Sequence, residues 1–193
     1  MKALREFLRH SAPGAVGFAL CVLLFVLAIG APLLAPYNPN SQNLPSRLEA
    51  PTTSHWMGTD ELGRDVLSRV IYGARVSMSV SVCVVFGAGI LGLALGSLAG
   101  YFGGLFDGIV NIVLINAFLS FPGILLAIAF AAFLGPGLAN VIIALTITGW
   151  AGYARLARAQ VLQAKEMDYV AAARSLGASH WRILWRHLLP NII

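Results

Sequence analysis

One short hydrophilic stretch gathers the side chains best suited to bind a metal ion. It contains an imidazole and three carboxylates: His55, Asp60, Glu61 and Asp65. Such groups are common ligands of zinc and related ions. The same stretch carries Arg64 and Arg69, which can pair with the acids, while Thr59 or Asp60 can cap a short helix. We favour the paired arrangement and predict neither a metal site nor a bound cofactor.

The residue patterns of common catalytic sites are missing from the sequence. It has no HExxH pair, no GxSxG turn and no GxxxxGK[ST] phosphate loop. These patterns place zinc ligands, a serine nucleophile and phosphate-binding amides, respectively. We therefore predict no catalytic residue and no enzymatic activity in this chain.

A short helix is predicted near the end of the sequence, over residues 168–176. Asp168 is its expected N-cap, and Gly177 is expected to end it in the left-handed conformation. Helical spacing puts a mostly small and apolar set on one face: Tyr169, Ala172, Ala173 and Leu176. This arrangement is typical of a docking element.

A second amphipathic helix is expected to follow, capped by Ser179 and ended by Pro190. Its apolar side repeats at helical spacing: Trp181, Leu184, Trp185 and Leu188. Tryptophans beside Arg182 and Arg186 favour a membrane interface. Two helices around a glycine turn also occur in DNA-binding motifs, but here the basic residues are spread over several faces, so no nucleic-acid partner is predicted. A solvated structural tail is the remaining alternative.

The spacing of this tail resembles the "EAA" loop in permease subunits of ATP-binding-cassette importers. That loop reads E-A-A, three residues, Gly, nine residues, I-x-L-P. Five positions match: Ala172, Ala173, Gly177, Leu189 and Pro190. Ala171 stands in place of the Glu and His187 in place of the Ile. If Asp168 is the N-cap, Ala171→Glu would close a capping box and stabilise the helix.

A second stretch resembles the dipeptide, oligopeptide and nickel branch of these permeases. It runs from His55 to Arg69 as HWMGTDELGRDVLSR and continues as YGARVS over residues 72–77. With Phe121-Pro122 and Gly135-Pro136-Gly137, the similarity extends from about Pro51 to the end of the sequence.

The resemblance implies a division of labour among several chains. Two permease chains would form the passage, two cytoplasmic ATPase subunits would power it, and an extracytoplasmic solute-binding protein would deliver the solute, with di- and oligopeptides as the expected substrates and nickel as the alternative. The expected contacts to the ATPase are Asp168, Tyr169, Ala171, Ala172, Ala173, Arg174, Gly177, Leu189 and Pro190.

The composition is that of a membrane protein. Of 193 residues, 58% are hydrophobic and only 11% charged, and the mean hydropathy is +0.79. Lys, Arg, Asp and Glu are missing from three windows, at 10–46, 76–106 and 108–154. Because a charge is costly at mid-membrane, these windows predict an all-α, polytopic bundle. The predicted spans are residues 15–35, 76–100, 108–134 and 138–154.

The distribution of basic residues predicts the orientation. Lys and Arg number three in the tail 1–14, four in the segment 36–75 and six in the loop 155–193. The positive-inside rule then places the N-terminus and the 155–193 loop in the cytoplasm and the 36–75 segment outside the inner membrane. A cleavable signal peptide is the alternative for the first span, but its apolar run is longer than usual for one.

Small and polar residues within the spans indicate packing and passage. Gly92, Gly96 and Gly100 recur every four residues, which predicts a seam against a neighbouring helix or a partner subunit. Asn116 and Ser120 share a face and could line a polar route or bond to another helix, and Pro122 is expected to kink the third span.

The resemblance calls for six spans and the sequence supplies four, so we expect the chain to be C-terminally incomplete. The alternative function is a membrane-anchored interaction or assembly subunit, or a truncated fragment that does not transport. An ion channel is a more distant alternative. Because no charged group lies within the predicted spans, a transporter driven by coupled ions is not expected.

Overall fold

A computed structural model describes residues 12–192, and these form helices and turns with one isolated bridge between Thr59 and Asp65. They divide into two compact units, 1–81 and 82–193, and the long helix α3 (Val66–Phe102) contributes to both. The expected cytoplasmic tail with Lys2, Arg5 and Arg9 lies mostly outside the described residues, as does Ile193.

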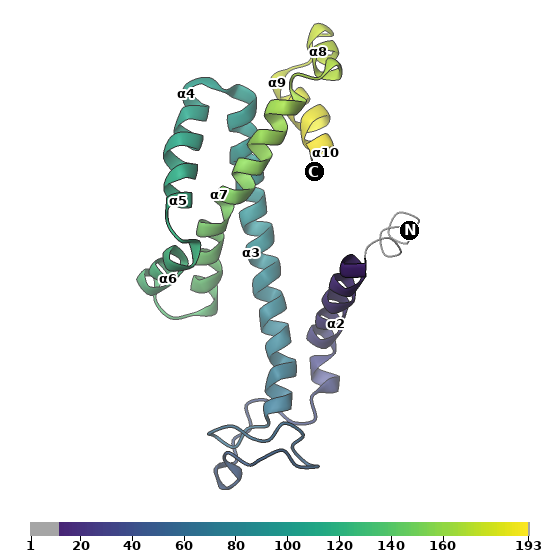
Figure 1. The fold of residues 1–193 in the computed structure, drawn as a ribbon, viewed down its shortest axis with the longest axis vertical. Helices are drawn as coiled ribbons and strands as arrows, with labels where there is room; N and C mark the ends of the chain where they lie inside the picture. The colour runs from purple at the N-terminus through teal and green to yellow at the C-terminus, as the bar shows by residue number, and fades with distance from the viewer. Residues whose placement is uncertain (1–11, 193) are drawn as a thin grey trace. The chain divides into compact units, whose positions relative to one another are not determined.

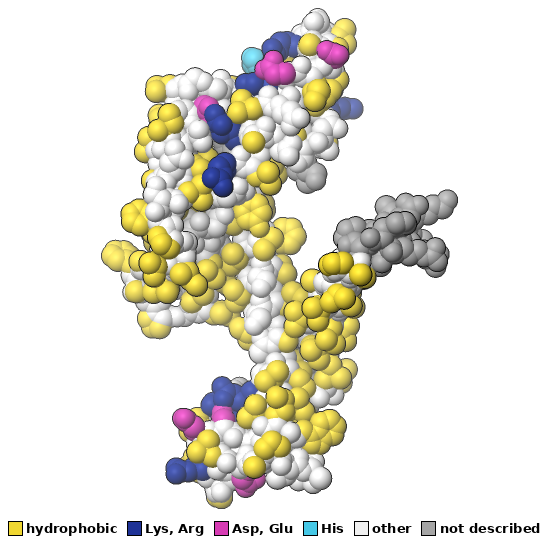
Figure 2. Space-filling view, in the orientation of Figure 1, with side chains coloured by type: hydrophobic (Ala, Val, Ile, Leu, Met, Phe, Trp, Pro, Cys, Tyr) yellow, Lys and Arg dark blue, Asp and Glu magenta, His cyan; other side chains and the backbone are white. Residues whose placement is uncertain are grey.

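The first unit consists of α2 (Ala12–Leu34), an irregular segment with a 3-10 turn η1 (Leu44–Ser46), and the beginning of α3 (Figure 1). Hydrophobic side chains cover α2, while charged ones gather on the irregular segment (Figure 2). That division suits a helix facing lipid and a segment facing water.

The second unit packs the remainder of α3 beside α7 (Leu138–Ala164), which runs along it in Figure 1. Between them in sequence come α4 (Gly104–Asp107), the π-helical η2 (Gly108–Ile115), α5 (Asn116–Ser120) and α6 (Gly123–Leu134). The chain ends with α8 (Asp168–Ser175), α9 (His180–Arg182), the π-helical η3 (Ile183–Leu188) and α10 (Leu189–Ile192).

The predicted all-α class is confirmed for the described residues. Two of their helices, α2 and α3, are long and apolar enough to cross a membrane, and a third candidate arises if the bent pair Gly104–Ser120 and Gly123–Leu134 is one span. Helix α7 is not among these candidates, so the predicted span at 138–154 stays a prediction.

Three boundaries differ from the sequence expectation. Helix α3 begins at Val66, ten residues before the predicted span, because Asp65 caps it there through a 2.7 Å bond from the Ser68 amide. The expected kink at Pro122 is a bend of 88°, which divides residues 108–134 into separate helices. Helix α7 continues without a break past residue 154 to Ala164.

Candidate functional site

Helix α8 is the core of the candidate docking element, and its beginning corrects the sequence analysis. The N-cap is Met167, with φ −75° and ψ 148°, and its side chain accepts no capping hydrogen bond. Asp168 is therefore the first helical residue, where its charge favours the positive end of the helix dipole. Ala171 lies one position beyond N3, so the proposed capping box for Ala171→Glu is wrong in register.

The end of α8 agrees with the prediction. Leu176 is the C-cap, and Gly177 follows with φ +77°, a left-handed conformation that glycine adopts without a Cβ clash. The amide of Ala178 then donates to the carbonyl of Ala173 at 3.0 Å, which closes the turn.

The four residues predicted to share an apolar docking face of α8 differ in their exposure. Val170 is fully buried and Ala173 is 8% exposed, whereas Tyr169, Ala172 and Leu176 are exposed. Ala171 and Arg174 are exposed as well. The predicted face is thus divided, because only Ala173 of its four members packs inward.

A small apolar core holds α8 to the rest of the second unit. Val170 belongs to a buried cluster that draws on α3, α7 and η3: Tyr101, Val161, Ile183, Leu184 and Leu188. Polar bonds reinforce it, since Lys165 Nζ donates to the Gly100 carbonyl at 3.2 Å and Tyr101 Oη lies 2.9 Å from His180 Nδ1. Helix α8 is therefore attached to both long helices of this unit.

The segment after α8 begins as expected but does not end at Pro190, because that proline lies within α10. Ser179 is an N-cap whose side chain accepts from the Arg182 amide. Leu184, Leu188 and Leu189 are buried, whereas the Trp181 and Trp185 side chains and Pro190 are exposed. The apolar pattern therefore separates into buried leucines and exposed tryptophans.

The glycine series of α3 lies against α7 of the same chain. A Cβ added at Gly92 would lie 2.6 Å from the carbonyl oxygen of Trp150, and one at Gly96 would lie 2.1 Å from that of Ala154. At Gly100 the Arg158 carbonyl oxygen would be 2.9 Å away. These distances are below van der Waals contact, so the two backbones approach as closely as they do only because side chains are missing.

An ion pair that the sequence analysis did not anticipate joins α4 to α7. Arg158 donates from Nε to Oδ1 of Asp107 at 2.5 Å and from Nη2 to Oδ2 at 2.6 Å. Such a two-pronged contact is among the stronger polar interactions of proteins. The sequence did contain a hint of this ion pair. Asp107 is the lone charged residue between two long uncharged windows, and a charge in such a position favours a partner of opposite charge.

The two candidate passage residues are exposed on α5. Ser120 Oγ donates to the Asn116 carbonyl at 2.6 Å, so this hydroxyl is satisfied by its own helix. Ser120 directly precedes the 88° bend, and Asn116 lies one helical turn earlier. Their role in a passage stays a prediction.

In the hydrophilic stretch of the first unit, Asp60 forms the expected ion pairs with arginine, but neither Thr59 nor Asp60 caps a helix, because the next helix, α3, begins only at Val66. Asp60 pairs with Arg64 at 2.8 Å and with Arg69, and its Oδ1 accepts from the Leu62 and Arg64 amides. Desolvation by itself would raise the pKa of Asp60, but these hydrogen bonds and the arginine charge hold that pKa below its usual range. Among the described residues, no group of three metal-binding side chains occurs.

Asp65 is the centre of a second polar network. Its Oδ1 lies 2.9 Å from His55 Nδ1, its Oδ2 accepts from the Ser68 hydroxyl at 2.7 Å, and that hydroxyl accepts from the Tyr37 amide at 3.0 Å. Burial alone would raise the pKa of Asp65, but the bonds from Ser68 and His55 outweigh it and lower that pKa. The network fastens the irregular segment to the start of α3.

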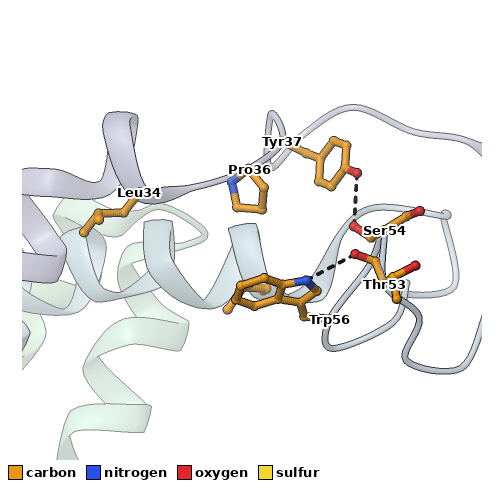
Figure 3. Close-up of a pocket in the computed structure, with 7 residues that line it drawn as sticks. Leu34, Pro36, Tyr37, Thr53, Ser54 and Trp56 are labelled. Carbon is orange, nitrogen blue, oxygen red and sulfur yellow. Dashed lines mark hydrogen bonds between the residues drawn. The ribbon is translucent and has the colours of Figure 1, made fainter.

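Two glycines explain the compactness of this segment. Gly58 and Gly63 have φ of +72° and +69°, and a Cβ at Gly63 would lie 1.8 Å from the Asn43 carbonyl oxygen. The first unit also contains a cavity of about 290 Å³ bordered by Pro36, Tyr37 and Trp56 (Figure 3). There Tyr37 Oη donates to the Ser54 carbonyl and Trp56 Nε1 to the Thr53 carbonyl.

Comparison with known proteins places these features in a family. Residues 92–193 match the profile of the binding-protein-dependent transport system inner membrane component, and residues 2–51 match the N-terminal TM domain of oligopeptide transport permease C. The second match extends the similarity to the region before Pro51, where the sequence analysis had found none.

Similar curated proteins cover nearly the whole chain. It is 42% identical over 175 residues to the dipeptide transport system permease protein DppC of Bacillus subtilis, covering 91% of this chain and 54% of that protein. It is 40% identical over 190 residues to the glutathione transport system permease protein GsiD of Pectobacterium atrosepticum, covering 98% and 62%. The oligopeptide transport system permease protein OppC of Bacillus subtilis is 39% identical over 176 residues, covering 91% and 57%.

The chain thus spans between about half and two thirds of the length of these relatives. The family profile alone covers more than half of the chain, over the helices that carry the glycine seam, the Asp107–Arg158 pair and α8. This chain belongs to the family of inner membrane components of binding-protein-dependent transport systems, a family of non-enzymatic ATP-binding-cassette permeases.

Proposed function

We propose that this chain is a permease subunit of an ATP-binding-cassette importer in the inner membrane, with di- and oligopeptides as its substrates. It forms part of the solute passage with a second permease subunit, and an extracytoplasmic solute-binding protein delivers the peptide. Separate ATPase subunits in the cytoplasm supply the energy. The names of the relatives support peptides over nickel, since they specify dipeptide, oligopeptide and glutathione transport.

The observation that supports this proposal most directly is that α8 is packed on one side and exposed on the other. Its buried side, Val170 and Ala173, is packed on the second unit, while Tyr169, Ala172 and Leu176 are left exposed and largely apolar. An element that is anchored on one side and apolar on the other can bind a partner and pass its motion to α3 and α7 as a rigid body. The ATPase is the partner, and α8 with its flanking residues is the EAA-like coupling element.

Energetics limits how this coupling works. ATP drives the permease only through its different affinity for the two conformations, and a shift from 1:99 to 99:1 requires about 5.5 kcal/mol. We expect the solute passage to run beside Asn116 and Ser120, which are exposed on α5 before the bend at Pro122.

Site-specific cross-linking tests the assignment in the assembled transporter. A photo-reactive residue at Ala172 is expected to cross-link to an ATPase subunit, with a yield that changes on ATP binding. The matched control is Leu105, which is exposed on α4 outside the docking element. No cross-link from Ala172 to an ATPase would overturn the proposal.

Uptake of labelled peptide distinguishes transport from an assembly role. Leu176→Ala removes an exposed side chain and should lower ATP-dependent uptake several-fold while leaving the amount of folded protein unchanged. Leu105→Ala, equally exposed on α4, is the control. ATPase binding without any peptide uptake by the wild type would instead support an assembly subunit, and uptake of nickel but not peptide would reassign the substrate.

A further inference from the structure

A groove on the second unit has no role in the function proposed above. It is a cavity of about 360 Å³ between α3 and the segment 181–189. Aliphatic side chains of α3 form one wall, and Leu184, Leu189 and the two tryptophans, Trp181 and Trp185, form the other. The tryptophans are 57% and 65% exposed, so the groove is open on that side.

The chemistry of the groove changes along α3. From Ile90 to Ser97 the helix rises by about 10 Å, and over this length the wall is aliphatic except for Ser97. Ser97 is 1% exposed, and its Oγ is a buried side-chain polar atom without a hydrogen-bond partner among the described residues. A hydroxyl in that state is costly unless it acquires a partner, and rotation about χ1 could offer it to an occupant of the groove.

Two arginines adjoin the tryptophans of the groove in sequence, although neither arginine lines the groove itself. Arg182 directly follows Trp181 and Arg186 directly follows Trp185, and both arginines are exposed. The described residues form no ion pair with either of them. Tryptophan and arginine together are typical of the level where lipid headgroups meet the acyl chains.

We propose that this groove binds one anionic phospholipid. An acyl chain lies along the wall from Ile90 to Ser97 between α3 and Leu184, and the headgroup phosphate is held by Arg182 and Arg186. The site is an integral part of the second unit, since Leu184 and Leu188 fix the 181–189 segment in the same buried cluster that holds Val170. The proposal does not depend on transport, because the binding energy comes from apolar contact and charge.

Native mass spectrometry of the detergent-purified chain tests this with dioleoyl-phosphatidylglycerol and dioleoyl-phosphatidylcholine. One phosphatidylglycerol per chain should remain bound at collision energies that remove phosphatidylcholine. Arg182→Gln with Arg186→Gln should lower phosphatidylglycerol retention at least fivefold. Arg47→Gln with Arg75→Gln removes the same charge from exposed residues of the first unit and should change nothing.

A spectroscopic measurement separates lipid from protein as the occupant. Brominated phosphatidylglycerol should quench the fluorescence of the wild type more strongly than that of Trp185→Phe. Equal retention of the two lipids, no effect of the Arg182 and Arg186 substitutions, or equal quenching in both proteins would each overturn the proposal. The last result is expected if a protein segment fills the groove instead.

Discussion

At the scale of single residues, the glycines of α3 and the carboxylates of the first unit are the positions where a substitution would disturb the structure most directly. Gly96 has no space for a Cβ, because the Ala154 carbonyl oxygen occupies it, while Gly89 on the same helix has nothing within 4 Å. The Asp65 carboxylate caps α3 by accepting from the Ser68 amide, and it also contacts the Ser68 hydroxyl and the His55 ring. Both arrangements make a single substitution informative.

Gly96→Ala is expected to destabilise the second unit by about 1–3 kcal/mol, because overpacking must push α3 away from α7. Thermal unfolding of the purified protein measures this as a lower melting temperature. Gly89→Ala is the matched control and should leave the melting temperature unchanged or raise it slightly, since alanine favours helix. Equal melting temperatures for the two variants would contradict the close approach.

Acid should loosen the first unit through Asp65. Its folded-state pKa is lowered, so the stability it contributes is complete above the ordinary carboxyl pKa of about 4 and is lost as the pH falls below that value. The protection of the amides of residues 52–68 against hydrogen exchange, measured relative to the intrinsic exchange rate at each pH, should therefore fall below about pH 4. In Asp65→Asn these amides should be less protected at neutral pH, and their protection should depend less on pH. Glu61→Gln, at an exposed position, should show the same protection as the wild type.

At the scale of elements, α8 shows how one residue of register changes an argument. With Met167 as N-cap, the N3 position belongs to Val170, which is buried, so no capping box can form without removing the anchor of the helix. The helix is held by packing on α3 and α7 more than by its own ends, as is usual for so short a helix.

Met167→Ser is expected to stabilise α8 by about 1 kcal/mol, because a serine at this position can accept from an amide of the first turn. Hydrogen exchange of the α8 amides in the intact protein would show stronger protection. Ala171→Glu should give a smaller increase of a few tenths of a kcal/mol through the helix dipole alone. The observed N-cap would be refuted if Ala171→Glu gave the greater protection.

At the scale of the whole molecule, the charges predict its orientation in the membrane. Residues 155–192 carry six basic side chains and the described segment 36–75 carries four, together with four acidic ones. The positive-inside rule places the first of these regions in the cytoplasm. The family's description as an inner membrane component agrees with a membrane location and leaves the orientation as a prediction.

Labelling of single cysteines tests this orientation. In a background with Cys21→Ala and Cys83→Ala, Ser54→Cys should react with a membrane-impermeant maleimide on the outer side of the intact inner membrane. Ser175→Cys should react only after that membrane is opened. Both positions are exposed, so the accessibility of the side chain itself is matched. The reverse pattern would invert the topology and remove α8 from reach of an ATPase.

The sequence by itself determined the features that follow from local chemistry. The hydrophobic composition indicated a membrane protein. Gly177 predicted the end of α8, and Pro122 predicted a break in the third span. The spacing from Ala172 to Pro190 identified the family. Each of these depends on the residue itself or on its near neighbours along the chain, so no knowledge of distant contacts was needed.

Only the tertiary structure decided which residues meet across the chain. The face of α8 that is buried depends on where Tyr101 and Val161 lie, the Asp107–Arg158 pair joins residues 51 positions apart, and the partner of the glycine seam is α7. Helical periodicity specifies which side chains share a face, but the side that packs inward is fixed by contacts between elements distant in sequence, because burial is a property of the assembled fold.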